Sequence, residues 1–316
     1  MSLAGLLTVV DDDPQLQVAV SRAEDGSVPE PVSPPGAAAD GQATTLAGED
    51  LVAPPTLRPV LAAALARSAH GSAPRFVLAV TATAREADDL AAALGSFLPP
   101  DSVGCFPGWE TLPHERLSPR SDIVGQRIAV LRRLAHPAAD GEPNGPLAVV
   151  VTPARSLLQP IVAGLGDLEP VALQVGQACD LDDLLARLVE IGYSRADMVG
   201  SRGEIAVRGG IVDVFPPTEE HPLRVEFFGD TVEEIRYFKV ADQRSIGPAE
   251  HGLWAPPCRE LLLTPAVKHR AKELADTHPA LADILGKLAE GIAVEGMEAF
   301  APVLADRMEL LLDYVP

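Results

Sequence analysis

The chain of 316 residues is long enough for two or three domains, and a hydrophobic content of 47% allows sizeable cores although only 4% of the residues are aromatic. Its formal net charge of −20 argues against broad, non-specific binding of DNA or RNA, which depends on clustered lysine and arginine. The sequence has no apolar run of the ~20 residues needed to span a bilayer and no basic secretory start, so we expect no membrane contact and a cytoplasmic location.

The first 152 residues have the alternating pattern of a parallel α/β domain. Residues 26–41 (GSVPEPVSPPGAAADG) favour a flexible linker because they are rich in proline, glycine and alanine. Helices are expected at residues 56–67, 84–94 and 121–134, and strands near Thr44 and at residues 76–81 (FVLAVT) and 147–151 (LAVVV). Gly95 is expected to end the second of these helices.

The turn at residues 82–86 (ATARE) joins a buried strand to a helix, which is where a phosphate-binding loop would lie. Such a loop needs glycines, so that backbone N–H groups can surround the phosphates, and a lysine next to serine or threonine. This turn has neither glycine nor lysine, and Glu86 would repel an incoming phosphate. We therefore predict that this turn has the position of a nucleotide site but lacks the residues that bind phosphate. We expect no cofactor, and we expect the chain to be a binding module and not an enzyme.

Residues 153–247 predict an inserted α+β domain with an antiparallel sheet. A strand is expected at residues 171–177, and Asp180 is expected to cap a helix that ends at Gly192. Two sets of side chains alternate along the next predicted strand, Leu223, Val225 and Phe227 against Arg224, Glu226 and Phe228. Gly229-Asp230 then predicts a two-residue hairpin turn.

Residues 248–316 are expected to be helical and to begin the second part of the α/β module. Thr264 and Pro265 form a good helix start, and residues 279–291 have a second helical pattern. The chain ends on an apolar run, MELLLDYVP, so we expect it to be a piece of a longer protein, cut within a domain.

Catalytic and metal-binding patterns are weak in this sequence. His114-Glu115 resembles the start of a zinc-protease motif, but Ser118 stands where the second histidine would be, which favours a solvated loop pair. Three cysteines lie more than seventy residues apart without zinc-ligand spacing and favour isolated thiols: Cys105, Cys179 and Cys258. We expect neither a metal site nor a catalytic site.

Three arginines of the middle domain, Arg195, Arg202 and Arg208, fall within fourteen residues. If the strands form a meander, these side chains converge on one exposed face and could anchor a protein partner; the alternative is a scatter of surface arginines. Phe215 is a fourth candidate, although its place at the end of the strand IVDVF favours the core over an interface.

Around these arginines the sequence resembles a known family. Residues 208–228 (RGGIVDVFPPTEEHPLRVEFF) closely resemble the signature shared by UvrB and by Mfd, the bacterial transcription-repair coupling factors. Residues 106–134, 237–245 (YFKVADQRS) and 291–300 (GIAVEGMEAF) resemble Mfd, so the likeness covers most of residues 45–316. The glycine-free turn after the first strand also resembles Mfd, whereas UvrB has an intact phosphate-binding loop.

The resemblance implies a fold and a function. The fold would be a degenerate P-loop-type, UvrB-like α/β domain with a parallel sheet at residues 1–152, interrupted by the small antiparallel domain at residues 153–247. The function would be that of a non-catalytic module whose middle domain binds UvrA and so recruits nucleotide excision repair to stalled RNA polymerase. Arg208 matches the strand-edge arginine of the signature and is the first candidate for the UvrA contact, ahead of Arg195, Arg202 and Phe215.

The family also implies partners beyond UvrA. In proteins of this family, other domains bind RNA polymerase and duplex DNA, and separate motor domains bind and use ATP. A C-terminal domain masks the UvrA-binding surface. The alternative interpretation is a UvrB-like, nucleotide-dependent helicase fragment, which ATP binding to the chain would distinguish.

Overall fold

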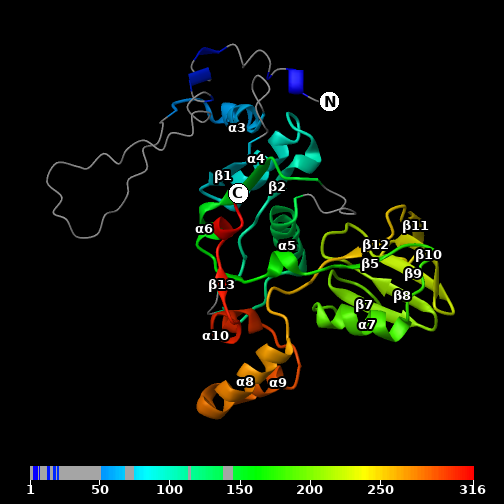
Figure 1. Cartoon of the computed structure of the whole chain (residues 1–316). Helices are drawn as coiled ribbons and strands as arrows, with labels where there is room; N and C mark the ends of the chain where they lie inside the picture. Colours follow the sequence, from blue (N-terminus) through cyan, green and yellow to red (C-terminus); the bar gives the residue numbers. More distant parts are fainter. Residues whose placement is uncertain are drawn as a thin grey trace.

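Figure 1 shows the computed structural model of the chain, which describes residues 51–67, 75–112, 115–137 and 145–316 and several positions between residues 3 and 20. The linker expected at residues 26–41, the strand near Thr44 and the side chain of His114 lie outside the described residues. Among the described residues, no helix is long and apolar enough to cross a membrane.

The first domain is built on three parallel strands in the order β1-β3-β2. Its strands and principal helices are β1 (Val77–Thr81), β2 (Val103–Cys105), β3 (Val149–Pro153), α3 (Arg58–Ala66), α4 (Ala84–Leu94) and α5 (Ser121–Ala135). Along β3, Val149 and Val151 pack with α3 and α4, while Val150 packs with α5. The strand is therefore buried on both faces, as its unbroken apolar sequence predicts.

The expected parallel α/β domain is thus confirmed, and its relation to P-loop folds stays a prediction. The sequence did not predict β2, because three residues with a central glycine give no apolar run. Gly104 has a packing reason: a Cβ there would lie 3.0 Å from a methyl group of Leu147.

The inserted domain forms the right-hand lobe of Figure 1. Its six-stranded sheet has the order β11-β10-β9-β8-β7-β6, and α7 (Leu181–Glu190) covers one face. The strands are β6 (Ser194–Arg195), β7 (Glu204–Arg208), β8 (Ile211–Val214), β9 (Leu223–Phe228), β10 (Thr231–Phe238) and β11 (Ser245–Pro248). The predicted helix cap is confirmed, since the Asp180 carboxylate accepts a hydrogen bond from the Asp183 N–H, and so is the hairpin at Gly229-Asp230.

The chain does not become helical directly after Gly247, contrary to expectation. Strand β11 continues to Pro248 and pairs with β10, and β12 (Leu253–Ala255) pairs with β5 (Val171–Leu173) on the inserted domain. These strands are three and four residues long, too short to show a period in the sequence. The limits between domains at residues 152/153 and 247/248 stay a prediction.

The last part of the chain forms a helical unit at the bottom of Figure 1 and then returns to the first domain. Its elements are α8 (Pro265–Thr277), α9 (Ala282–Ala289), α10 (Ala301–Leu304) and β13 (Met308–Glu309). The predicted start of α8 is confirmed, because the Thr264 hydroxyl accepts from the Val267 N–H. Strand β13 pairs with β4 (Ile161–Val162), and Leu311 is buried in the core beneath α5.

The inserted domain packs tightly on α5 of the first domain. A Cβ at Gly125 would lie 2.6 Å from the Cβ of Pro217, so only glycine allows α5 to approach that loop. Gly203 has a φ of +85°, and a Cβ there would lie 2.8 Å from the Oγ of Ser121. These two close approaches set the position of the inserted domain against the first domain.

Candidate functional site

The turn at the start of α4 satisfies its own helix terminus. The Thr83 hydroxyl accepts a hydrogen bond from the Glu86 N–H at 3.2 Å, and the Glu86 carboxylate accepts from the Thr83 N–H at 3.1 Å. Helix N-termini bind phosphate through free N–H groups and a positive dipole end. Here Glu86 brings a fixed negative charge to that position, which opposes a nucleotide phosphate.

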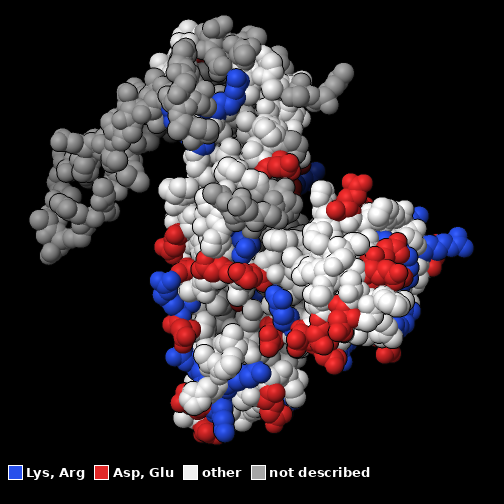
Figure 2. All heavy atoms as spheres, turned by 45° about the vertical axis from the view of Figure 1, so that its right-hand side comes forward, with Lys and Arg blue, Asp and Glu red and all other residues white. Residues whose placement is uncertain are grey.

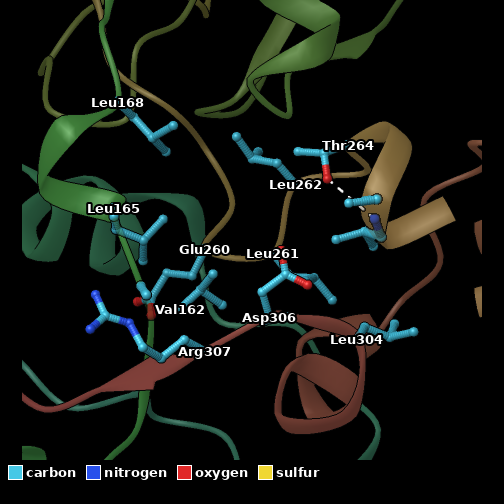
Figure 3. A pocket seen from close by; sticks show the side chains of 15 residues that line it. Val162, Leu165, Leu168, Glu260, Leu261, Leu262, Thr264, Leu304, Asp306 and Arg307 are labelled. Carbon is cyan, nitrogen blue, oxygen red and sulfur yellow. Dashed lines mark hydrogen bonds between the residues drawn. The ribbon is translucent and has the colours of Figure 1, made fainter. Parts of the chain in front are cut away.

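A cavity of about 350 Å³ lies between the first domain and the C-terminal helical unit. Figure 3 shows leucines from separate chain segments around it: Leu165, Leu168, Leu261, Leu262 and Leu304. Glu260 at its wall is already hydrogen-bonded by Trp109 and Arg127, and Arg307 pairs with Glu309. The cavity therefore offers mainly apolar contact.

The cysteines are poorly suited to nucleophilic chemistry. All three are free, and burial raises the pKa of Cys105 and of Cys258 to about 12. A thiol with such a pKa is almost wholly protonated at neutral pH, and the thiolate is the reactive form. Within the described parts of the chain, no three histidine, cysteine or acidic side chains gather closely enough to hold a metal ion.

The inserted sheet presents charged side chains on the face away from α7. Alternation along the strands places the apolar residues against α7 and the charged ones on the other side. We call this second side the charged face and define it by Arg208, Asp213, Arg224, Glu226, Phe228, Glu234 and Arg236. The register puts Asp213, Arg224 and Arg236 in one row across β8, β9 and β10.

Asp213 is the centre of this face. Its carboxylate is completely buried and accepts from Arg208 Nη2 at 2.7 Å, Arg224 Nε at 2.6 Å and Arg224 Nη2 at 2.8 Å. The side chain of Arg208 is 50% exposed, whereas that of Arg224 is 15% exposed and lies 4.5 Å over the Phe238 ring. The carboxylate raises the pKa of Arg224 further, so this cation is permanent.

The neighbouring part of the charged face has both signs of charge and an aromatic ring. Arg236 pairs with Glu226 and, at 2.6 Å, with Glu234. Phe228 stands at the hairpin end of β9 and is 80% exposed. Exposed aromatic residues and arginines are both enriched at the energetic centres of protein interfaces.

The three predicted arginines do not converge on one face. Arg195 pairs in register with Ile205, whose side chain packs towards α7, so Arg195 lies on the opposite side of the sheet from Arg208. Arg202 lies at the other end of β7, where its Nε donates to the Glu219 carbonyl at 2.9 Å. The twist and register of the strands, which the sequence does not specify, cause this separation.

Phe215 belongs to the core, as its position in the sequence favours. It is buried with Val199, Ala206 and Phe238, and the Arg202 guanidinium lies 5.2 Å over its ring. Sequence reasoning overlooked Arg224 and Phe228 as companions of Arg208. The alternation along residues 223–228 already placed both on the polar side of β9, so the signal was present.

Comparison with known proteins decides the relationship. The UvrB interaction domain family matches residues 171–256, the segment from β5 to just beyond β12. Over 276 residues the chain is 55% identical to the transcription-repair-coupling factor of Mycobacterium tuberculosis, covering 84% of this chain and 22% of that protein. The chain is a relative of the transcription-repair-coupling factors. The factor of Bacillus subtilis is 30% identical over 280 residues, which cover 82% of this chain and 22% of that protein. The factor of Escherichia coli is 28% identical over 213 residues, which cover 66% of this chain and 18% of that protein.

The resemblance to Mfd is therefore confirmed. The chain spans only about a fifth of these relatives, at 22% of the mycobacterial proteins. The matched domain coincides with the inserted lobe that carries the charged face.

Proposed function

We propose that this chain is a non-catalytic recruitment module that binds UvrA through the charged face of the inserted domain. Binding would bring nucleotide excision repair to RNA polymerase stalled on DNA. The observation that carries the proposal is that the UvrB interaction domain match, residues 171–256, contains the whole sheet on which Arg208 stands half-exposed.

The geometry supports a protein partner with acidic groups. Arginine forms bidentate, charge-assisted hydrogen bonds with carboxylates, and arginine and aromatic residues are frequent energetic centres of interfaces. Arg208 and Phe228 are both accessible on the charged face. Arg195, on the other side of the sheet, and Arg202, at the far end of β7, are weaker candidates for the same contact.

The rival function is that of a UvrB-like, nucleotide-dependent helicase fragment. It would need a phosphate-binding turn after β1, and the capping interaction of Glu86 with Thr83 places a carboxylate there instead. We therefore favour a module without ATP chemistry of its own.

The remaining four-fifths of the relatives would supply the other activities. We propose that RNA polymerase and duplex DNA are bound by those parts, that a C-terminal domain masks the charged face, and that the protein acts in the cytoplasm. These roles rest on the family resemblance.

The test is UvrA binding by an Arg208→Ala variant. We expect the affinity to fall roughly thirtyfold, the equivalent of ~2 kcal/mol for an arginine truncated in a desolvated interface. The melting temperature should be nearly unchanged, because Arg224 still pairs with both oxygens of Asp213. Arg187→Ala on α7, an exposed arginine on the opposite side of the domain, is the matched control and should bind normally.

Two results would refute this assignment. An affinity of Arg208→Ala within about twofold of the unaltered chain would show that Arg208 is outside the interface. Unfolding of the variant would show that Arg208 is a structural residue.

A further inference from the structure

We propose that Asp213 is a positioning residue for partner binding, which holds Arg208 and Arg224 in the geometry that a carboxylate of the partner meets. The inference deepens the proposed function and rests on it. Asp213 itself is completely buried and makes no contact with a partner; it acts through the arginines.

The first step is the way Asp213 uses its lone pairs. It accepts three N–H groups from two guanidinium groups, at 2.6 to 2.8 Å. Such charge-assisted bonds are short and directional, and an arginine that donates two of them to one carboxylate is fixed as a planar fork. Arg224 is held in this way through Nε and Nη2.

A second group holds Arg224 from the other side. Gln243 Oε1 accepts from Arg224 Nη2 at 3.3 Å, and Gln243 Nε2 donates to the Val240 carbonyl at 3.0 Å. Gln243 has a φ of +60°, a left-handed conformation that is uncommon outside glycine. The backbone thus adopts an unfavourable conformation at the residue whose side chain reaches Arg224.

Arg208 is tied at one point only. Its Nη2 donates to Asp213, and the structure assigns no further hydrogen bond to its guanidinium within the described residues. An arginine has five N–H donors, so most of those on Arg208 remain available on a side chain that is half exposed. The arrangement anchors one nitrogen and leaves the rest of the fork to a partner.

Charge gives the second argument. Asp213 lies between two arginines, so it reduces the repulsion between the two cations and leaves this pair of arginines with one more positive charge than the single carboxylate balances. A side chain held in its bound orientation also loses less conformational entropy on association. Asp213 would therefore increase affinity for an acidic partner group while remaining out of contact with it.

The experiment measures UvrA affinity for Asp213→Asn in the unaltered chain and in an Arg208→Ala background. The amide keeps the shape but replaces one acceptor by a donor that repels the guanidinium groups. We expect roughly a tenfold loss in the unaltered chain, from the ordering that a free arginine must then undergo. In the Arg208→Ala background the same change should cost about threefold or less, because Asp213 acts through that arginine.

A matched control separates positioning from stability. Val212→Ala changes the residue of β8 that directly precedes Asp213 and is buried on the α7 side. It should lower the melting temperature and leave UvrA affinity unchanged. Equal losses for Asp213→Asn in both backgrounds, or an affinity within about twofold of the unaltered chain, would overturn the inference.

A spectroscopic signature tests Asp213 without the partner. The Nε–H proton of Arg224, donated to Asp213 at 2.6 Å, should exchange slowly with water and give a sharp nitrogen–proton correlation that Asp213→Asn abolishes. The two tests fail independently. If Arg208→Ala leaves UvrA binding intact, the proposed function is wrong. If the Arg224 signal survives in Asp213→Asn, the positioning role of Asp213 is wrong, whatever the binding result.

Discussion

The buried ion pair between Arg127 and Glu260 makes the sharpest stability prediction. Arg127 on α5 is fully buried, and its Nε donates to Glu260 Oε1 at 2.5 Å. Trp109 Nε1 donates to the same oxygen at 2.9 Å, and the guanidinium lies 4.3 Å over the Phe106 ring. One carboxylate thus joins α5, the loop after β2 and the segment that leaves the inserted domain.

Glu260→Gln removes the negative charge and keeps the shape. Breaking a buried pair by removing one partner costs about 3–5 kcal/mol, because it leaves an uncompensated charge in the interior. We expect the lower end, ~3 kcal/mol, since the Pro107 carbonyl and Gln159 still accept from Arg127 Nη1. Urea unfolding followed by circular dichroism at neutral pH would measure the change in the free energy of unfolding.

The control replaces both charges. Arg127→Met combined with Glu260→Leu removes the buried pair without stranding either ion and should recover most of the lost stability. A Glu260→Gln variant within about 1 kcal/mol of the unaltered chain would refute the reasoning, because Arg127 would then be compensated by its other neighbours.

Three further predictions concern ligands and the core. Calorimetry should show no tight ATP binding and assays no ATP hydrolysis, because Glu86 places a carboxylate at the start of α4; a dissociation constant in the low micromolar range would contradict this. Anisotropy titrations should show weak duplex DNA binding at physiological salt, because the net charge is −20 and Figure 2 shows acidic and basic side chains interspersed; submicromolar, salt-sensitive binding would count against it. Phe215→Ala should lower the free energy of unfolding by ~3 kcal/mol or more, because the ring is buried with Val199 and Phe238; a thermal melt shifted by less than about 2 °C would place the ring outside the core.

Local sequence signals predicted the longer elements of the fold well. The apolar run at β1, the capping residues Asp180 and Thr264 and the hairpin at Gly229-Asp230 each act within a few residues, so the sequence reveals them. Strands of three or four residues, such as β2 and β12, have no such signal. They form because long-range pairing partners are available, which no window of sequence contains.

The candidate site was predictable only in part for a related reason. Arg208 could be singled out from its motif, but its neighbours on the charged face come from β8, β9 and β10, up to twenty-eight residues further along the chain. A shift of one residue in strand register would move each of them to the other face. The sequence could therefore name the first arginine and could not show that Arg224 shares its carboxylate.

Glu260 and Asp213 are both buried carboxylates that pair with arginine, and the exposure of the arginine separates their roles. Arg127 is as buried as Glu260, so neither side chain of that pair is accessible to a partner, and the pair can only hold chain segments together. Asp213 is equally buried, but the side chain of its partner Arg208 is 50% exposed to solvent. The same ion-pair chemistry thus predicts opposite mutational effects. Changes at Glu260 should lower stability and leave UvrA affinity intact, whereas Arg208→Ala should lower affinity and leave stability intact.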